Sequence, residues 1–359
     1  MAGFSSDDDS NGFHDGDGNK TAGKVIKCKA AVVWAPGEPF MMEEIEVEAP
    51  RRLEVRLRIL FTSICHTDLT AWMGENESQR VFPRVLGHEA AGVVESIGEG
   101  VEDLRPGDRV VPVFNGECGD CAACRSSKTN LCCGFAVDPN RSVMRSDGRV
   151  RFYCAGRDGV RRGVGAAWNA ANVDEGSKVA IFGLGAVGLA VAEGARLRGA
   201  AQIIGVDINT DKFVKGREMG ITEFVNPQDY TKSVHEVVRE LSKGGVDYSF
   251  ECSGNLDVLR QAFLSTHKGW GLTVVLGIHP SPRMLPLHPM ELFERKMVAS
   301  VFGDFKPKSQ LPDIINKWII GANKINLDGF ITHELPFTEI NQAFQLLSEG
   351  KALRCLLKL

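Results

Sequence analysis

Four closely spaced cysteines are the first residues of this sequence whose types and spacing indicate a specific chemistry. They are separated by two, two and seven residues, as Cys118, Cys121, Cys124 and Cys132. Four thiolates at these spacings can surround one zinc ion, and a site closed by four protein ligands is structural rather than catalytic. An iron–sulfur cluster is the alternative, but it usually has a shorter last spacing and a proline after the final cysteine, whereas Cys133 follows here. We therefore predict a structural zinc.

A glycine-rich turn indicates a dinucleotide site. Gly183, Gly185 and Gly188 form the pattern Gly-x-Gly-x-x-Gly directly after the apolar run 179–182, and Asp207 follows 19 residues after the last glycine. Such glycines let the backbone approach a pyrophosphate, which lies at the N-terminus of the following helix. The Asp207 carboxylate would accept hydrogen bonds from the adenosine ribose and repel a 2′-phosphate, which favours NAD over NADP. A helix N-cap or a loop acid is the alternative for Asp207.

A cysteine and a histidine in the first third of the chain offer another set of metal ligands. Cys65 opens a Cys-His-Thr-Asp segment, and His88 lies within Gly-His-Glu. A thiolate and an imidazole suit zinc, although each residue taken alone is more often a buried cysteine and a hydrogen-bonded core histidine. The four-cysteine and dinucleotide patterns in the same chain favour a zinc site here.

The elements that must position these residues fall into two groups. Short apolar or alternating runs, broken by proline, glycine and charge, predict an antiparallel β-rich region over residues 30–33, 45–48, 55–59, 93–98 and 110–113. From residue 178 onward strands alternate with helices, which predicts a parallel sheet with helices on both faces. The fold class is therefore α/β. Helical segments around 311–320 and 340–349 precede a final strand at 353–357.

Length and composition exclude several classes of protein. The 359 residues, with 43% hydrophobic and 25% charged side chains, are typical of a globular chain of two domains. No uncharged run reaches the roughly 18 residues of a membrane helix. The net charge of −4 gives no general attraction to nucleic acid or anionic membranes. Residues 1–22 are rich in Asp, Ser and Gly and predict a disordered acidic tail rather than a targeting peptide, so we expect a cytoplasmic protein.

An arginine-rich stretch covers residues 137–162. It holds seven arginines against three aspartates and has little apolar periodicity. We expect an exposed, poorly ordered loop there. A nucleic-acid site is not favoured because no aromatic side chains alternate with the charge.

Together these motifs make the chain resemble the zinc-containing medium-chain alcohol dehydrogenases, in particular the plant alcohol-dehydrogenase-like proteins. The resemblance extends over about residues 25–137 and from residue 163 to the C-terminus. It rests on the four-cysteine lobe and on residues 64–68, 87–92, 183–189, 205–209 and 332–337. It implies a doubly wound Rossmann domain inserted in a β-rich, GroES-like zinc domain. The implied bounds are a catalytic zinc domain over 23–162 with its zinc lobe at 115–135, an NAD-binding domain over 163–302, and a return to the catalytic domain over 303–359.

The resemblance also implies roles at the catalytic zinc. Cys65 and His88 match its ligands, Thr67 matches the hydroxyl that accepts the substrate's proton, and Asp68 and Glu89 match acids near the metal. Zinc would bind and orient the alcohol oxygen as a Lewis acid and lower its pKa.

On the coenzyme side, the resemblance assigns pyrophosphate contacts to His66 and Arg354 and an adenosine-ribose contact to Lys212. Gly277 and Ile278 match the segment that lines the nicotinamide end, where the hydride is received. The expected substrate is a primary or secondary alcohol or the corresponding aldehyde. The expected assembly is a homodimer through the edge strand of the nucleotide domain.

Two departures from the family pattern concern the catalytic zinc. The family's third zinc ligand is a cysteine just before a Gly-x-Ser-Thr-Gly turn, whereas residues 161–164 here are Arg-Arg-Gly-Val. An internal segment that should form strands between the zinc lobe and this turn is missing, and Cys154 is the only thiol between Cys133 and Gly163. The family's proton-relaying histidine is replaced by Thr70, so that proton release needs water or another group. We therefore expect a weak catalytic zinc site and reduced activity.

Two other functions compete with this interpretation. The glutathione-dependent formaldehyde dehydrogenases have an arginine four residues after the last cysteine of the lobe, where this chain has Ala136. The missing third ligand instead favours a non-catalytic, NAD-binding, structural-zinc protein that pairs with an intact paralogue. The sequence does not separate the latter from an enzyme of low activity.

Overall fold

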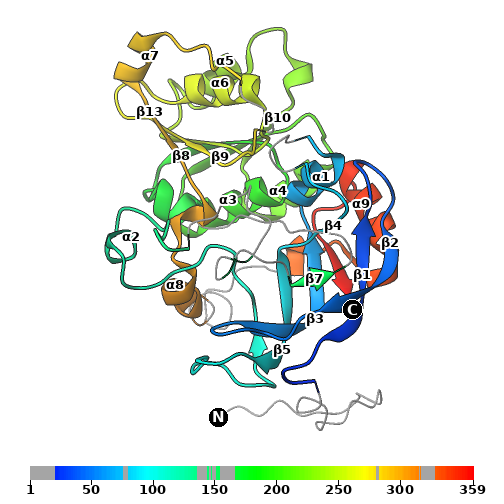
Figure 1. Cartoon of the computed structure of the whole chain (residues 1–359). Coiled ribbons are helices and arrows are strands. Elements are labelled where there is room, and N and C mark those ends of the chain that lie inside the picture. Colours follow the sequence, from blue (N-terminus) through cyan, green and yellow to red (C-terminus); the bar gives the residue numbers. More distant parts are fainter. Residues whose placement is uncertain are drawn as a thin grey trace.

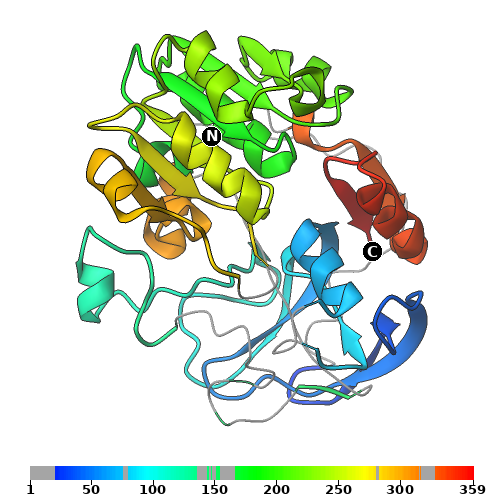
Figure 2. The same ribbon diagram turned by 90° about the horizontal axis from the view of Figure 1, so that it is seen from above.

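The computed structural model describes residues 21–75, 80–135, 144, 147, 151–153, 166–279, 283–314, 316 and 328–359. Most of the acidic tail and of the arginine-rich stretch lies outside these ranges, as do Ala136, Cys154 and residues 161–164. Figure 2 shows the described chain as a domain drawn green to orange beside the blue and cyan N-terminal strands, with the red C-terminal segment near both.

A parallel sheet of six strands organises the second half of the chain, as the sequence predicts. Its strand order is β10-β9-β8-β11-β12-β13, and each pair of neighbours is parallel. The strands are β8 (Lys178–Phe182), β9 (Gln202–Val206), β10 (Glu223–Val225), β11 (Tyr248–Glu251), β12 (Leu272–Val275) and β13 (Lys296–Ala299). The order reverses between β8 and β11, and ligands of such sheets bind at this reversal, outside the carboxyl ends of the strands.

Helices cover both faces of this sheet. They are α3 (Ala186–Leu197), α4 (Lys212–Glu218), α5 (Val234–Leu241) and α6 (Leu256–Ser265), and α7 (Pro289–Glu294) precedes β13. Figure 1 shows α3 and α4 on one face and α5 and α6 on the other. Successive strand residues point to opposite faces, so Ile181 packs in a cluster with Leu189 of α3, whereas Phe182 packs with Val238 of α5. Burial on both faces explains why residues 179–182 of β8 are all apolar.

The remaining strands form two smaller sheets, with the orders β4-β1-β2-β7 and β14-β15-β3-β5-β6. Their bounds are β1 (Ile26–Val33), β2 (Met41–Val47), β3 (Val55–Ile64), β4 (Arg84–Val85), β5 (Glu89–Ile97), β6 (Arg109–Val110), β7 (Phe152–Tyr153), β14 (His333–Pro336) and β15 (Cys355–Lys358). The C-terminal β15 is antiparallel to β3, with Cys355 opposite Ile64. The end of the chain thereby packs with N-terminal strands.

Short helices complete the described structure. They are α1 (His66–Met73), α2 (Ala122–Arg125), α8 (Pro307–Ile314) and α9 (Ile340–Ser348), with shorter helical turns at Ala166–Ala170, Pro227–Asp229, Phe302–Asp304, Asp328–Phe330 and Phe337–Glu339. Phe344 of α9 packs with Ile64 and Leu357 in the core of the N-terminal domain. Among the residues described, no helix combines the length and apolar character needed to cross a bilayer.

One part of the arginine-rich stretch differs from the exposed loop that we expected. Arg151 is only 7% exposed, because its guanidinium forms ion pairs with Glu54 at 2.7 Å and Asp147 at 3.0 Å. The next two residues form β7, which pairs with β2. A buried arginine needs such partners, and Glu54 is too distant in sequence for charge counting to reveal it.

Candidate active site

Two groups of side chains in the described chain could hold a metal ion. In each, the potential ligand atoms all lie within 4.8 Å of one another. One group is the four cysteines of the lobe, and the other is Cys65, His88 and Glu89. Both contain residues that the sequence marked as zinc ligands.

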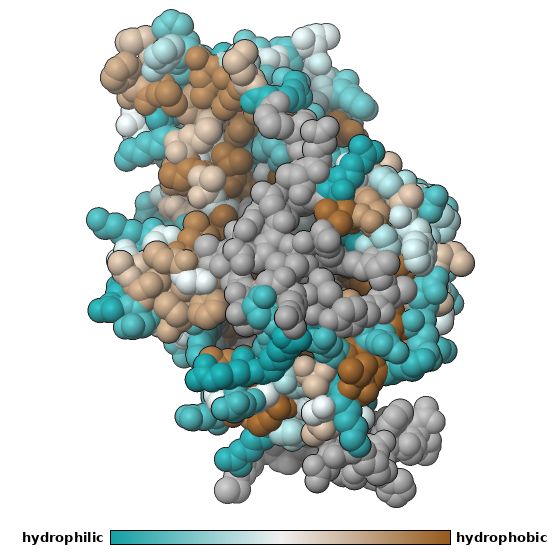
Figure 3. Space-filling model, viewed as in Figure 1, coloured by the Kyte–Doolittle hydropathy of each residue, from teal (hydrophilic) through white to brown (hydrophobic). Residues whose placement is uncertain are grey.

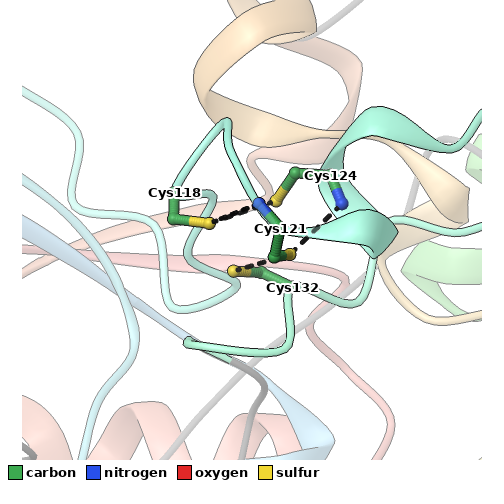
Figure 4. Close-up of side chains that lie close together, drawn as sticks. All are labelled: Cys118, Cys121, Cys124 and Cys132. Atoms are coloured by element: carbon green, nitrogen blue, oxygen red, sulfur yellow. Dashed lines mark hydrogen bonds between the residues drawn. The ribbon is translucent and has the colours of Figure 1, made fainter.

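The four lobe cysteines have the spacing of a zinc tetrahedron (Figure 4). The Sγ atoms of Cys118 and Cys124 are 3.8 Å apart, and those of Cys121 and Cys132 are 3.9 Å apart. Zn–S bonds of about 2.3 Å give sulfur–sulfur edges of about 3.8 Å in a tetrahedron. The residues present therefore fit a zinc ion.

Backbone N–H groups stabilise negative charge on one of these sulfurs. The amides of Cys124 and Cys133 each donate to Cys121 Sγ at 3.4 Å, and these bonds lower the pKa of the Cys121 thiol to about 5. Burial first, and then the neighbouring sulfurs, instead raise the pKa of the Cys124 thiol to about 12. A full set of four thiolates therefore requires a bound cation.

The lobe is held to the rest of the chain by polar contacts. Lys306 Nζ donates to the carbonyls of Cys124 and Ser126, and Asn130 Nδ2 donates to the carbonyls of Val301 and Phe305 at 2.7 and 2.9 Å. Within 115–135 the buried residues are Asn115, Asn130 and Cys132. With so little apolar core, metal binding must supply much of the folding free energy of the lobe.

The second group lies where β3 meets α1 and where β5 begins. Cys65 Sγ is 3.1 Å from His88 Nε2. His88 Nδ1 is 3.0 Å from Asp68 Oδ1, and Asp68 Oδ2 accepts the Cys65 amide at 3.0 Å. A carboxylate facing Nδ1 places the ring proton there and leaves the Nε2 lone pair directed at the sulfur, an arrangement typical of zinc-ligating histidines.

The environment of Cys65 also suits a cation. Burial raises the pKa of its thiol far above the ordinary value, and the charges of Asp68 and Glu89 raise it further, while Arg354 opposes them. A thiolate is therefore stable here only beside a positive charge. The Cys65 side chain also accepts the Thr67 amide at 3.3 Å, which places Thr67 in the first turn of α1 next to the ligand pair.

Glu89 supplies the remaining ligand atom in the described part of this group. Its Oε1 is 3.7 Å from His88 Nε2 and 3.4 Å from an Arg354 guanidinium nitrogen. From the sequence, Glu89 was expected as an acid near the metal that could also serve as a replacement ligand, with Cys154 as the alternative. The contact of Glu89 with Arg354 joins positions 265 residues apart. The region of the family's third cysteine, and Cys154, lie outside the described residues.

Three residues expected to contact the coenzyme come from three elements. His66 begins α1, Lys212 begins α4 and Arg354 immediately precedes β15. Protein atoms around the solvent-accessible His66 ring partly desolvate it and lower its pKa, and the charges of Arg354 and Lys212 lower it further. These interactions show that the three residues lie in one region. The positive charges of Arg354 and Lys212 there suit an anionic pyrophosphate.

The glycine turn has the geometry that the fingerprint predicts. Gly183 has a φ of +95°, and a Cβ on Gly188 would lie 1.9 Å from the Gly183 carbonyl oxygen. Gly185 is the N-cap of α3 and has no side chain to cap it, and a Cβ there would meet nothing within 4 Å. The first turn of α3 is thus open to a phosphate.

Asp207 ties this turn to the end of β9. Its Oδ2 accepts the Leu184 amide at 2.7 Å and the Lys212 ammonium at 2.9 Å, and its Oδ1 accepts the Asn209 amide at 2.8 Å. The N-cap alternative is not supported, because the N-cap of α4 is Asp211. The bond to Leu184 is a second role that the sequence pattern did not reveal.

Gly277 and Ile278 follow β12 and lie against the turn after β11. The Gly277 amide donates to the Glu251 carbonyl at 2.9 Å, and a Cβ on Gly277 would lie 2.2 Å from the Gly254 nitrogen. Ile278 is 44% exposed. Glu251 itself, the last residue of β11, was not among the expected site residues. Its one sequence signal is an acid at the carboxyl end of an apolar strand.

Two family models match the chain. A family model described as "Alcohol dehydrogenase GroES-like domain" matches residues 51–181, and one described as "Zinc-binding dehydrogenase" matches residues 186–318. "Alcohol dehydrogenase-like 4" of Arabidopsis thaliana is 56% identical over 381 residues, covering 95% of this chain and 100% of that protein. "Alcohol dehydrogenase 1" of Solanum tuberosum is 45% identical over 376 residues, covering 94% and 98%. Both alignments are longer than this 359-residue chain, so the relatives carry residues inside the aligned region that it lacks.

Solved structures show the same fold. An alcohol dehydrogenase zinc-binding domain protein from Burkholderia ambifaria superposes with a TM-score of 0.81 at 29% identity, covering 94% of this chain and 100% of that one. Benzyl alcohol dehydrogenase from Acinetobacter calcoaceticus gives a TM-score of 0.82 at 25% identity, covering 93% and 99%. The similarity therefore extends over both domains.

Proposed function

The chain belongs to the zinc-containing medium-chain alcohol dehydrogenase family, and on that premise we propose that it transfers hydride between a primary or secondary alcohol and NAD, at a reduced rate. The observation that carries this proposal is the contact of Cys65 Sγ with His88 Nε2 at 3.1 Å, with Asp68 behind the histidine. Such a pair suits a zinc ion that must remain open to substrate.

Bound zinc would supply Lewis acidity toward the substrate oxygen. The residues of the chain position the ligands, accept the proton and bind the coenzyme. Asp68 holds the His88 ring and the Cys65 backbone in place through its two oxygens. The Thr67 hydroxyl would accept the proton that the alcohol loses and release its own proton to water, and the nicotinamide of a bound coenzyme would supply the hydride acceptor. The glycine turn and Asp207 bind the adenosine half of the coenzyme.

We propose Glu89 as the third protein ligand of the zinc. Catalytic zinc sites normally have three protein ligands, and among the described residues Glu89 is the one that joins Cys65 and His88 in the same group. Its carboxylate must leave Arg354, 3.4 Å away, to bind a metal. This competition weakens the site relative to one with two thiolates, and for this reason we propose a reduced rate.

A direct assay tests the activity. We expect the purified chain, supplied with zinc, to form NADH slowly from primary or secondary alcohols, because the Cys65, His88 and Glu89 group and the glycine turn for the coenzyme are both present. Cys65→Ala should abolish NADH formation and leave NAD binding unchanged. NAD binding with no turnover of any alcohol would instead support the second candidate, a non-catalytic NAD-binding partner of an intact paralogue. That candidate is favoured by the missing third cysteine.

Coenzyme choice gives a second prediction. Asp207→Gly should weaken NAD binding roughly tenfold or more, the range for hydrogen bonds to a charged group. It should also reduce the ratio of the affinity for NAD to the affinity for NADP. The carboxylate that repels a 2′-phosphate is lost, and Lys212, its partner at 2.9 Å, is released to attract one. Titrations of both coenzymes measure this. Asp211→Asn, a change at a nearby exposed acid whose side chain forms no cap bond, is the matched control. An unchanged affinity of Asp207→Gly for NAD would refute the assignment.

We also propose a homodimer formed through β13. In the described chain β13 is the last strand of its sheet, and apolar side chains near it are exposed, at 40% for Val298, 52% for Leu292 and 80% for Phe293. Figure 3 shows hydrophobic surface over the region of α7 and β13. Exposed apolar surface beside an open strand edge is typical of an association site.

Sedimentation tests the dimer. The wild-type chain should sediment as a dimer and Phe293→Asp as a monomer, because a charge would be buried without a partner. Met284→Asp, at a residue that is 92% exposed and precedes α7, is the control for an added charge on the surface. A monomeric wild-type chain would contradict the proposal.

A further inference from the structure

A buried carboxylate at the carboxyl end of β11 is only half satisfied. Glu251 is fully buried, and its Oε1 accepts hydrogen bonds from the Ser253 amide at 2.7 Å, the Ser253 hydroxyl at 2.6 Å and the Gly254 amide at 2.8 Å. Its Oε2 has no hydrogen-bond partner among the described residues. A buried carboxylate oxygen without a donor costs free energy.

His279 faces this oxygen. Its Nε2 is also buried without a partner among the described residues, and it lies 3.6 Å from Glu251 Oε2. An N–H···O hydrogen bond is about 2.7–3.2 Å long. An approach of about half an ångström would therefore satisfy both atoms at once.

The pair lies directly beside the segment expected at the nicotinamide. His279 comes two residues after Gly277, and a Cβ on Gly277 would lie 2.4 Å from Glu251 Oε2. The backbone of Ile278 is equally close to the turn, since a Cβ on Gly254 would lie 2.4 Å from the Ile278 carbonyl oxygen. Any movement of residues 277–279 thus changes the distance between Glu251 and His279.

We propose that His279 is a positioning residue for the coenzyme. Its Nε2–H donates to Glu251 Oε2 when NAD binds, and this bond holds Gly277 and Ile278 against the nicotinamide end. His279 Nε2 and Glu251 Oε2 have no hydrogen-bond partner among the described residues before NAD binds, and they pair with each other when it is bound. The bond therefore contributes to the difference in free energy between the free and the bound states, which is the quantity that sets affinity. This inference rests on the proposed use of NAD.

Calorimetric titration of the full chain with NAD tests the proposal. His279→Leu removes the donor and should weaken NAD binding about tenfold, as expected for one hydrogen bond to a charged group. His279→Gln keeps an N–H of similar reach and should retain most of the affinity. His267→Leu is the matched control, because His267 precedes the amino end of β12, whereas His279 follows its carboxyl end, and because His267 stacks on Trp270.

The outcomes separate this inference from the proposed function. The wild type, His279→Leu and His279→Gln should melt at similar temperatures without NAD, because the 3.6 Å between His279 Nε2 and Glu251 Oε2 is too long for a hydrogen bond that the substitution would break. Equal NAD affinity of His279→Leu and the wild type would overturn the inference, as would a His279→Gln variant as weak as His279→Leu. A wild-type chain that does not bind NAD would instead refute the coenzyme proposal itself.

Discussion

Cys121→Ser should release one zinc per chain and unfold the lobe. The Cys121 sulfur accepts two backbone amides and lies 3.9 Å from that of Cys132, so its loss removes one corner of the tetrahedron. Binding of structural zinc is worth an apparent 10–16 kcal/mol, about the whole stability of a small domain. The lobe has no apolar core to replace it. We expect lower zinc content, a lower melting temperature and new proteolytic cleavage within 115–135.

Cys133→Ser is the matched control for this prediction. Cys133 is the adjacent residue, its thiol is exposed, and it is not part of the four-sulfur group. It should keep wild-type zinc content and melting temperature. The Cys121→Ser variant should still bind NAD, because the glycine turn belongs to the other domain. Unaltered zinc content in Cys121→Ser would show that the lobe does not bind the metal as described.

Gly188→Ala should strongly destabilise the coenzyme domain. The added Cβ would lie 1.9 Å from the Gly183 carbonyl oxygen and 3.2 Å from the Ile181 side chain. Both the β8 strand and the α3 helix are buried, so neither can move without opening the core. A backbone clash of this kind costs about 4 kcal/mol or more, which corresponds to a fall in melting temperature of roughly 10 °C. Thermal unfolding and soluble yield measure the effect.

Gly185→Ala separates folding from coenzyme binding at the same turn. Its φ of −77° suits any residue, and its Cβ would meet nothing within 4 Å. The melting temperature should stay near that of the wild type. The affinity for NAD should fall at least about tenfold, because the methyl group occupies the space through which the pyrophosphate approaches the backbone. Equal NAD affinity in Gly185→Ala and the wild type would mean that the coenzyme binds elsewhere.

The sequence was sufficient to predict the fold because its signals were local and mutually consistent. The glycine pattern, the preceding apolar strand and Asp207 all lie within about thirty residues of one another, the length of a βαβ unit. The spacing of the lobe cysteines likewise limits their geometry to a short loop. Each of these predictions depends on neighbours in sequence, where chain geometry leaves few alternatives.

Contacts between residues far apart in the sequence could not be predicted in this way. Glu89 is beside Arg354 because β15 and β5 both flank β3, and nothing in either residue's own neighbourhood indicates the other. The same holds for Arg151 with Glu54 and for His279 with Glu251. Arg151 and Glu251 are buried, and Glu89 and Arg354 are partly buried; in each case the polar partner comes from a distant element. Such pairs become visible only when the sheet order is known.

Zinc titration of the metal-depleted chain, followed by elemental analysis, tests the central claim most directly. We predict two zinc ions per chain at saturation, one bound tightly by the lobe and one bound weakly by Cys65, His88 and Glu89. Glu89→Gln should lose only the weak ion, and Cys154→Ala should change little. A single zinc at saturation would contradict the account and favour a non-catalytic protein. Two tight ions, one of them lost in Cys154→Ala, would equally contradict it, because a cysteine would then supply the ligand that we assign to Glu89.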